Sequence, residues 1–161
     1  MRFVVDVMLG RLAKWLRILG YDTFYDPSAR DEELLKRVEE EKRILLTRDT
    51  RLAARLKSDR CLLIESQNAK EQLRQVVQAF GLDASNYLLS ICTRCNEKVE
   101  SVNKSAVKGK VPGYVFANHD EFVQCGRCGR IYWSGSHFQE VQRWIQESLE
   151  IKGNAEQERN R

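Results

Sequence analysis

The sequence predicts an α/β domain with a parallel sheet between two layers of helices, followed by a smaller part with paired cysteines and by a last helix. Two observations predict this order. Short apolar runs alternate with helical patterns up to about residue 82, which is typical of a parallel sheet covered by helices. From about residue 86 onward the apolar periodicity weakens and cysteines appear in two pairs. We therefore expect domains at 1–85 and 86–150 and a polar tail at 151–161.

The spacing of apolar residues predicts the individual elements. Short runs rich in β-branched, aromatic or leucine residues predict strands at 3–5, 21–25, 44–47 and 61–64. Apolar residues at three- and four-residue steps predict helices at 9–19, 31–41, 50–57, 69–80 and 138–149. Gly20 and Gly81 follow two of these helices, and glycine most readily adopts the left-handed conformation that ends a helix.

Composition and charge restrict the class of protein. The 161 residues are 42% hydrophobic and 31% charged, which fits a soluble globular protein. The formal net charge of +4 permits an acidic polymer as partner. No apolar run approaches the roughly 20 residues of a membrane span, and Arg2 and Asp6 interrupt any signal-peptide core. We therefore expect a cytoplasmic protein that does not bind membranes, and whose cysteines are thiols or metal ligands.

Four of the five cysteines form two C-x-x-C pairs separated by 29 residues: Cys92, Cys95, Cys125 and Cys128. Four thiolates on two tight turns are the ligand set of tetrahedral zinc, and they leave no open position, so the ion would be structural. Iron is the main alternative, and a redox role for one pair is another. Asn96 and Gly129, which follow the pairs, tolerate the positive φ of such turns. Cys61 lies in a predicted strand and is expected in the core, whereas His119 and His137 would be ligands only in place of a cysteine.

Acidic residues end two of the predicted strands. Asp6 follows the first strand and Asp49 the third, and ligands gather at the carboxyl edge of open α/β sheets. Clustered carboxylates repel one another unless a divalent cation neutralises them, and their oxygens suit Mg²⁺ or Mn²⁺. Glu32 or Glu33, at the start of the second helix, would supply a third ligand. The alternative is that Asp6 and Asp49 cap the helices that follow them, which is compatible with metal binding.

Several segments resemble a known family, and together they cover nearly the whole chain up to about residue 146. Residues 5–17 (VDVMLGRLAKWLR) and 19–23 (LGYDT) resemble the ribonuclease domain at the carboxyl end of the Mut-seven proteins. Residues 44–52 (ILLTRDTRL) resemble the segment that carries a metal-binding Asp in PIN-domain ribonucleases. Residues 132–137 (YWSGSH) resemble the closing signature of the Mut-seven family, which joins a PIN-like fold to a zinc ribbon.

The resemblance implies a three-layer PIN-like domain, a zinc ribbon, and a ribonuclease that uses Mg²⁺ or Mn²⁺ on single-stranded RNA. Asp6 and Asp49 would be the catalytic metal ligands, with Glu32 or Glu33 as the third acid. The sequence departs from many PIN enzymes after the fourth strand, where Glu65 or Asn68 would have to serve as the fourth ligand. PIN-like domains often pair, so a homodimer is one alternative and the oligomeric state stays open.

Basic residues would hold the RNA. Arg11, Lys14 and Arg17 fall at three-residue steps on the first predicted helix, with Trp15 beside them, a pattern suited to a phosphate backbone and a stacked base. Arg48 adjoins Asp49 and would contact the scissile phosphate. His137 would contact RNA or only hydrogen-bond within an interface. A second basic stretch lies between the cysteine pairs: Lys98, Lys104, Lys108 and Lys110. The alternative for each cation is a solvated side chain or an ion pair.

Three functions remain open on the sequence alone. The first is a metal-dependent endoribonuclease whose ribbon helps to bind RNA. The second is a non-catalytic RNA-binding module in which Asp6 and Asp49 are only helix caps. The third is a protein-interaction module, for example at the ribosome, in which the ribbon docks a partner. Cleavage of RNA that depends on both aspartates distinguishes the first from the others.

Overall fold

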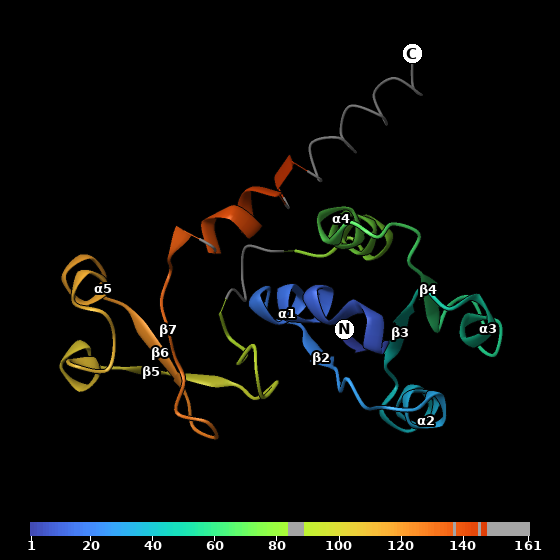
Figure 1. The fold of residues 1–161 in the computed structure, drawn as a ribbon, viewed down its shortest axis with the longest axis horizontal. Helices are drawn as coiled ribbons and strands as arrows, with labels where there is room; N and C mark the ends of the chain where they lie inside the picture. Colours follow the sequence, from blue (N-terminus) through green and yellow to red (C-terminus); the bar gives the residue numbers. More distant parts are fainter. Residues whose placement is uncertain (84–88, 137, 145, 148–161) are drawn as a thin grey trace, which may run out of the picture.

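A computed structural model describes residues 1–83, 89–136, 138–144 and 146–147. The first part of the chain is organised around a four-stranded parallel sheet in the order β2-β1-β3-β4 (Figure 1). The strands are β1 (Arg2–Val5), β2 (Asp22–Phe24), β3 (Ile44–Thr47) and β4 (Cys61–Leu63). In register, Val5 lies opposite Leu46, so β1 and β3 end side by side at the same edge.

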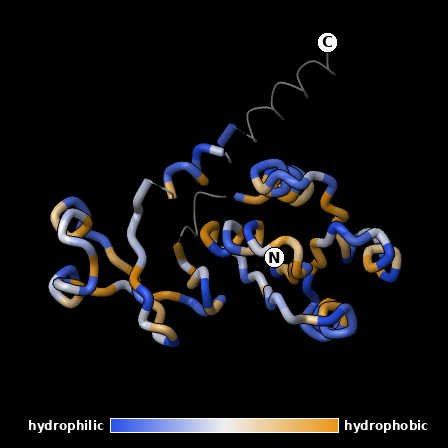
Figure 2. Tube along the Cα trace, viewed as in Figure 1, coloured by the Kyte–Doolittle hydropathy of each residue, from blue (hydrophilic) through white to orange (hydrophobic). Residues whose placement is uncertain are grey.

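Helices cover both faces of this sheet. Phe3, Val5 and Leu46 pack with α1 (Gly10–Ile18) and α4 (Ala69–Phe80), whereas Val4 and Leu45 pack with α2 (Asp31–Glu41) and α3 (Thr50–Ala53). This division follows from the alternation of side chains along a strand. Hydrophobic positions lie along the central strands, and hydrophilic ones predominate on α2 and α4 (Figure 2). The predicted three-layer α/β fold is confirmed.

Two of the predicted helices differ in detail. The first begins with a 3-10 turn, η1 (Val7–Leu9), before α1 starts at Gly10. The helix predicted at 50–57 is α-helical only over Thr50–Ala53, because the backbone hydrogen bonds that follow span three residues instead of four. The N–H of Arg55 donates to the carbonyl of Leu52, and that of Leu56 to the carbonyl of Ala53, which are three-residue rather than four-residue steps.

The second part of the chain carries a small antiparallel sheet in the order β5-β6-β7. Its strands are β5 (Val99–Val102), β6 (Phe122–Cys125) and β7 (Ile131–Tyr132), and η2 (Lys104–Val107) and α5 (Gly113–Asn118) lie between β5 and β6. Val107, Val115 and Phe122 form its own small core. The expected domain boundary between 85 and 86 and the tail at 151–161 lie outside the described residues.

The last helix returns to the first domain. Residues 138–144 and 146–147 are helical, and the end predicted at 149 lies outside the described residues. Val141 is fully buried in the core formed by α1 and α4. The Trp144 ring meets Trp15 of α1 edge to face, with 4.9 Å between ring centroids. The last helix therefore packs on the first domain, leaving Trp15 only 8% exposed.

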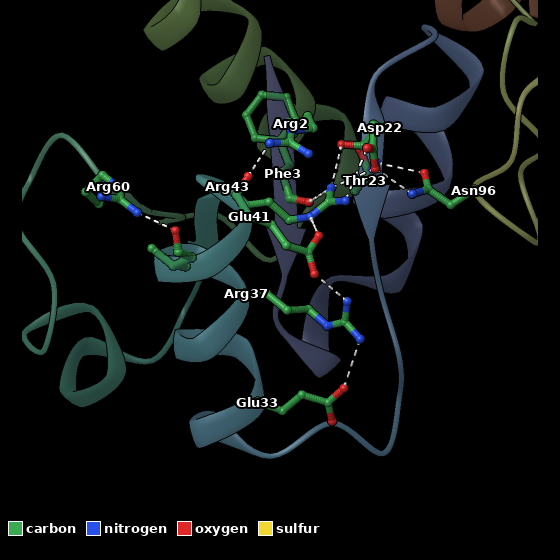
Figure 3. A network of polar contacts seen from close by, with 11 residues as sticks. Arg2, Phe3, Asp22, Thr23, Glu33, Arg37, Glu41, Arg43, Arg60 and Asn96 are labelled. Atoms are coloured by element: carbon green, nitrogen blue, oxygen red, sulfur yellow. Dashed lines mark hydrogen bonds and ion pairs between the residues drawn. The ribbon is translucent and has the colours of Figure 1, made fainter.

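Hydrogen bonds join the first cysteine turn to the edge strand β2. The N–H of Thr23 donates to Asn96 Oδ1 at 2.8 Å, and the Thr23 carbonyl accepts from Arg17 Nε at 2.9 Å. Arg17 Nη1 also donates to the carbonyls of Thr93 and Arg94. Asn96 Nδ2 donates to Asp22, which also pairs with Arg43 (Figure 3). We call these contacts the β2 junction.

The opposite edge of the parallel sheet is occupied by a glutamine. Gln75 Nε2, from α4, donates to the carbonyl of Leu63 at 2.8 Å. The N–H of Glu65 donates to Gln75 Oε1 at 3.1 Å. One carboxamide therefore satisfies both a donor and an acceptor at the end of β4.

Candidate acidic site and cysteine cluster

Asp6 and Asp49 lie at one edge of the parallel sheet, joined by the hydroxyl of Thr47. Asp6 continues β1, and its N–H donates to the carbonyl of Leu46 at 3.0 Å. Thr47 Oγ1 donates to Asp6 Oδ2 at 2.6 Å and accepts from the N–H of Asp49 at 2.9 Å. Because β1 and β3 are adjacent and parallel, their ends bring these groups together. We call Asp6, Thr47 and Asp49 the acidic edge.

Asp6 does not act as a helix cap. It occupies the N-cap position of η1, but its side chain accepts no capping hydrogen bond. The residue is 5% exposed, and among the described residues the Thr47 hydroxyl is the one group that donates to its carboxylate. No described cation forms an ion pair with it. A buried carboxylate with so few partners is costly in free energy, and a cation would relieve that cost.

Asp49 does cap a helix. Its Oδ1 accepts from the N–H groups of Arg51 at 2.7 Å and Leu52 at 3.2 Å, at the start of α3. Within the described residues Oδ2 accepts no hydrogen bond, and the residue is exposed. The capping alternative therefore holds for Asp49 and not for Asp6, and one oxygen of each carboxylate is left without a donor.

The third acid is not gathered with these two. Glu33 pairs with Arg37 at 3.3 Å, and Glu32, which is 76% exposed, lies 3.7 Å from Arg55. Both stand in the first turn of α2, which follows β2 and so begins at the same edge of the sheet. Among the described residues, the cysteines form the one group of three or more potential metal-ligand atoms within 4.8 Å of one another. A third carboxylate would have to move to join the acidic edge.

The residues considered for a fourth ligand have other partners or remain apart. Asn68 Oδ1 accepts from the N–H groups of Lys70 and Glu71, so it caps α4. Glu65 is bound to Gln75 through its backbone N–H. Neither belongs to a preformed ligand cluster among the described residues.

The predicted RNA contacts occupy different environments. Arg11 and Lys14 are exposed on α1, whereas Arg17, expected beside them, is 6% exposed and bound to three backbone carbonyls of the β2 junction. Arg48 is half-buried, and its Nε has no hydrogen-bond partner in the structure. His137 lies outside the described residues. Trp15 is covered by Trp144, so it is not open to stack on a base.

The four paired cysteines meet in one cluster. Their Sγ atoms all lie within 4.8 Å of one another: Cys92, Cys95, Cys125 and Cys128. Asn96 (φ 61°) and Gly129 (φ 71°) take the left-handed conformation, and their N–H groups donate back to the carbonyls of Cys92 and Cys125. Four thiolates in this arrangement have the ligand set of a structural zinc site. Cys61 lies in β4, away from the cluster.

Hydrogen bonds favour one thiolate in this cluster. Burial raises the pKa of Cys92, but the Tyr132 hydroxyl, 3.0 Å from its Sγ, and the N–H of Cys95, at 3.3 Å, outweigh burial and lower that pKa to about 6. Burial and the thiols of Cys128 and Cys92 raise the pKa of Cys95 to about 12. A divalent cation would favour ionisation of the remaining thiols, so metal binding releases protons.

Two contacts at these sites cannot be predicted from the sequence. The position of Thr47 at a strand end, just before Arg48 and Asp49, weakly indicates that it lies near the site, but its bond to Asp6 depends on the register of β1 against β3. Tyr132 stands in a segment that resembles the Mut-seven signature, but its bond to Cys92 depends on how β7 approaches the first cysteine turn.

Comparison with known proteins identifies the family. The model of the Mut7-C RNAse domain matches residues 1–145. The chain belongs to the Mut7-C RNAse domain family. Membership implies ribonuclease activity and hence an RNA substrate. Searches of curated proteins and of solved structures return no match. Within the described part of this Mut7-C chain, every helix is too short or too polar to cross a lipid bilayer.

Proposed function

We propose that this Mut7-C protein is an endoribonuclease that cleaves single-stranded RNA with the help of Mg²⁺ or Mn²⁺. The observation that carries the proposal is the pairing of Asp6 and Asp49 through Thr47 at the carboxyl edge of the sheet. The buried Asp6 carboxylate has no cationic partner among the described residues and leaves one oxygen without a donor, which fits a hard divalent cation. The cysteine cluster fits a structural zinc ion.

Each residue has a stated role in this proposal. Asp6 and Asp49 would hold the divalent cation, which when bound polarises the phosphate and lowers the pKa of a bound water. Thr47 orients Asp6 by donating to one of its oxygens. Glu32 or Glu33 would complete the ligand set after its ion pair opens. Arg11, Lys14 and Arg48 would bind backbone phosphates, and His137 keeps its expected contact to RNA.

One observation favours a second candidate. Among the described residues, no third carboxylate lies with Asp6 and Asp49 at the acidic edge. This observation favours, as the second candidate, a non-catalytic RNA-binding protein with the same fold. The oligomeric state stays open, with a homodimer as one alternative. The two functions differ in whether RNA is cut, which makes cleavage the measurement that separates them.

The test is cleavage of end-labelled single-stranded RNA with Mg²⁺ or Mn²⁺ by the wild type, Asp6→Asn and Asp49→Asn. Asp49→Asn keeps the helix cap, since Asn68 forms the same two bonds at the start of α4. We expect each variant to fold and to cleave on the order of a hundredfold more slowly. Cleavage at the wild-type rate by both variants contradicts the nuclease site. RNA binding without cleavage under either metal supports the second candidate.

A further inference from the structure

A cavity of about 530 Å³ lies between α1 of the first domain and the ribbon. Lys14 and Ile18 form the wall on the α1 side. The other lining residues come from the segment around the first cysteine turn, from α5 and the residue after it, and from the stretch that runs from β7 into the last helix. Pockets of this size hold small molecules or single nucleotides. The acidic edge does not contribute to this cavity, so it is a separate site.

Aromatic side chains form part of the lining of the cavity. Tyr114, Tyr132 and Trp133 line it, and Tyr114 is 72% exposed although it is a large aromatic residue. Trp133 packs against the ribbon core of Val107, Val115 and Phe122, and Gly135 lies so close to its ring that a Cβ there would be 3.2 Å from Nε1. Exposed aromatic faces that line a pocket are the stacking surfaces on which single-stranded nucleic acids place their bases.

The charges around the cavity are positive. Lys14 and Arg130 line it and are exposed, and no carboxylate is among the described lining residues. Asp120, the neighbour of His119, forms its ion pair with Lys104 at 2.8 Å. A cavity that combines aromatic faces with unopposed cations is complementary to a base and its flanking phosphates rather than to an apolar peptide.

The surface of α1 connects this cavity to the acidic edge. Asp6 directly precedes η1 and α1, and Arg11 stands one turn before Lys14, on the same side of the helix. Gly10 to Ile18 spans roughly 12 Å at 1.5 Å per residue. A strand that follows these cations from the acidic edge would reach the cavity within a few nucleotides.

We propose that the cavity is a base-binding subsite for single-stranded RNA, in which an unpaired base stacks on Tyr114 and Trp133 while Lys14 and Arg130 hold the adjoining phosphates. This inference rests on the proposed function and gives it a substrate subsite on the ribbon. The ribbon thereby positions the strand that the acidic edge cuts.

The experiment measures binding of a labelled single-stranded RNA and of an abasic oligomer of equal length, by fluorescence anisotropy without Mg²⁺ or Mn²⁺. Tyr114→Ala removes the exposed ring from α5 and is expected to keep the fold, since alanine favours helix. We expect it to weaken RNA binding about tenfold. The abasic oligomer should bind the wild type more weakly and be insensitive to this variant.

Charge variants complete the test. Arg130→Ala should weaken binding of both oligomers and reduce the salt dependence of binding, because a phosphate contact does not need the base. Lys36→Ala removes an exposed cation from α2, far from the cavity lining, and should leave binding unchanged. Unchanged RNA affinity in Tyr114→Ala, equal affinity for the abasic oligomer, or no RNA binding by the wild type at low salt would overturn the subsite.

The two proposals fail separately. Cleavage that depends on Asp6 together with unchanged binding in Tyr114→Ala removes the subsite and leaves the nuclease. Weakened binding in Tyr114→Ala together with cleavage by Asp6→Asn removes the acidic edge as the active site and leaves the subsite.

Discussion

Thr47 decides how Asp6 is held. Its hydroxyl has one hydrogen and two lone pairs, and it uses the hydrogen for Asp6 and a lone pair for the N–H of Asp49. Thr47 is fully buried and Asp6 is nearly so, so the bond between them is shielded from water. The orientation of the Asp6 carboxylate is therefore set by a residue that is not itself acidic.

Replacing Thr47 with Val tests this role, because the two side chains have nearly the same shape. The change leaves Asp6 Oδ2 and the N–H of Asp49 without partners, so we expect a loss of about 1–3 kcal/mol in the free energy of unfolding. Metal-dependent cleavage should fall as well. Urea denaturation and the RNA cleavage assay give the two quantities.

Thr23→Val is the matched control. Thr23 is equally buried in the same sheet, and its hydroxyl donates to the carbonyl of Tyr21, away from the acidic edge. We expect it to lower stability by about 1 kcal/mol and to leave cleavage intact. If both variants lose cleavage in proportion to their stability, Thr47 has no specific part in the site.

For single residues, the sequence predicts which side chains lie at the acidic edge of the sheet, but not all of the hydrogen bonds that they form. Asp6 and Asp49 could be placed because each ends an apolar run. The Asp49 cap is among the alternatives that the sequence offers, because its hydrogen bonds reach only the next two or three residues along the chain. The role of Arg17 could not be predicted, because its carbonyl partners Thr93 and Arg94 lie over 70 positions away.

Among the elements, the edge strand β2 carries a partly buried ion pair between Asp22 and Arg43. Arg43, whose side chain is 8% exposed, lies 2.6 Å from Asp22 and 2.5 Å from Glu41. Burial raises the pKa of Asp22, but the hydrogen bonds from Arg43 and Asn96 outweigh burial and lower it. Stability from this pair is therefore present above the unfolded-state pKa of about 3.9, and it is lost as pH falls through the lower folded-state value.

Asp22→Asn should remove this contribution. Near neutral pH we expect a loss of about 1–3 kcal/mol in the free energy of unfolding, less than for a fully buried pair because the Asp22 side chain is 34% exposed. The difference from the wild type should shrink as pH falls below about 4, because the carboxyl of the unfolded chain is protonated first, and it should vanish once pH has fallen through the lower native-state pKa. Urea denaturation at several pH values measures both effects.

Glu40→Gln provides the comparison for that series. Glu40 pairs with Lys36 at 3.9 Å and both side chains are about two-thirds exposed. The change should alter stability by less than about 0.5 kcal/mol at every pH. A pH-independent deficit in Asp22→Asn would show that the charge of Asp22 is not what matters.

Elements with strong periodicity were predictable from the sequence, and elements that depend on packing were not. The helices at 31–41 and 69–80 and the strand at 44–47 match the structure residue for residue. Helix α5 has no such signal, because its six residues are too few to show a repeat. The strands of the ribbon are two to four residues long, too short to show a clear alternation of apolar and polar residues.

Over the whole molecule, the cysteine cluster also supports the first domain. Thr93, Arg94 and Asn96 of the first cysteine turn bind Arg17, Thr23 and Asp22, which lie in α1 and β2. This junction could not be foreseen, because it depends on how the turn approaches β2. If the cluster holds zinc, as we propose, loss of that ion should change the structure around residues that are distant from the cysteines in sequence.

Chelation of zinc is expected to lower the melting temperature of the full chain. It should also speed hydrogen exchange of the Thr23 amide, whose partner Asn96 sits on the cysteine turn. Cys95→Ser should lose zinc and show both effects, whereas Cys61→Ala should retain a full zinc content, since Cys61 is outside the cluster. An unchanged Thr23 exchange rate after chelation would show that the turn keeps its shape without metal.

Side chains occupy backbone groups at both edges of the parallel sheet, with Gln75 at the β4 end and Asn96 with Arg17 at β2. Gln75, at the β4 edge, belongs to the first domain itself. Asn96, at the β2 edge, can keep its hydrogen bond to Thr23 only while the first cysteine turn stays folded. A chain stripped of its metal uncovers that strand, and an uncovered edge strand is a template for strand addition by another molecule. A metal ion held by the four cysteines would thus protect the protein from aggregation.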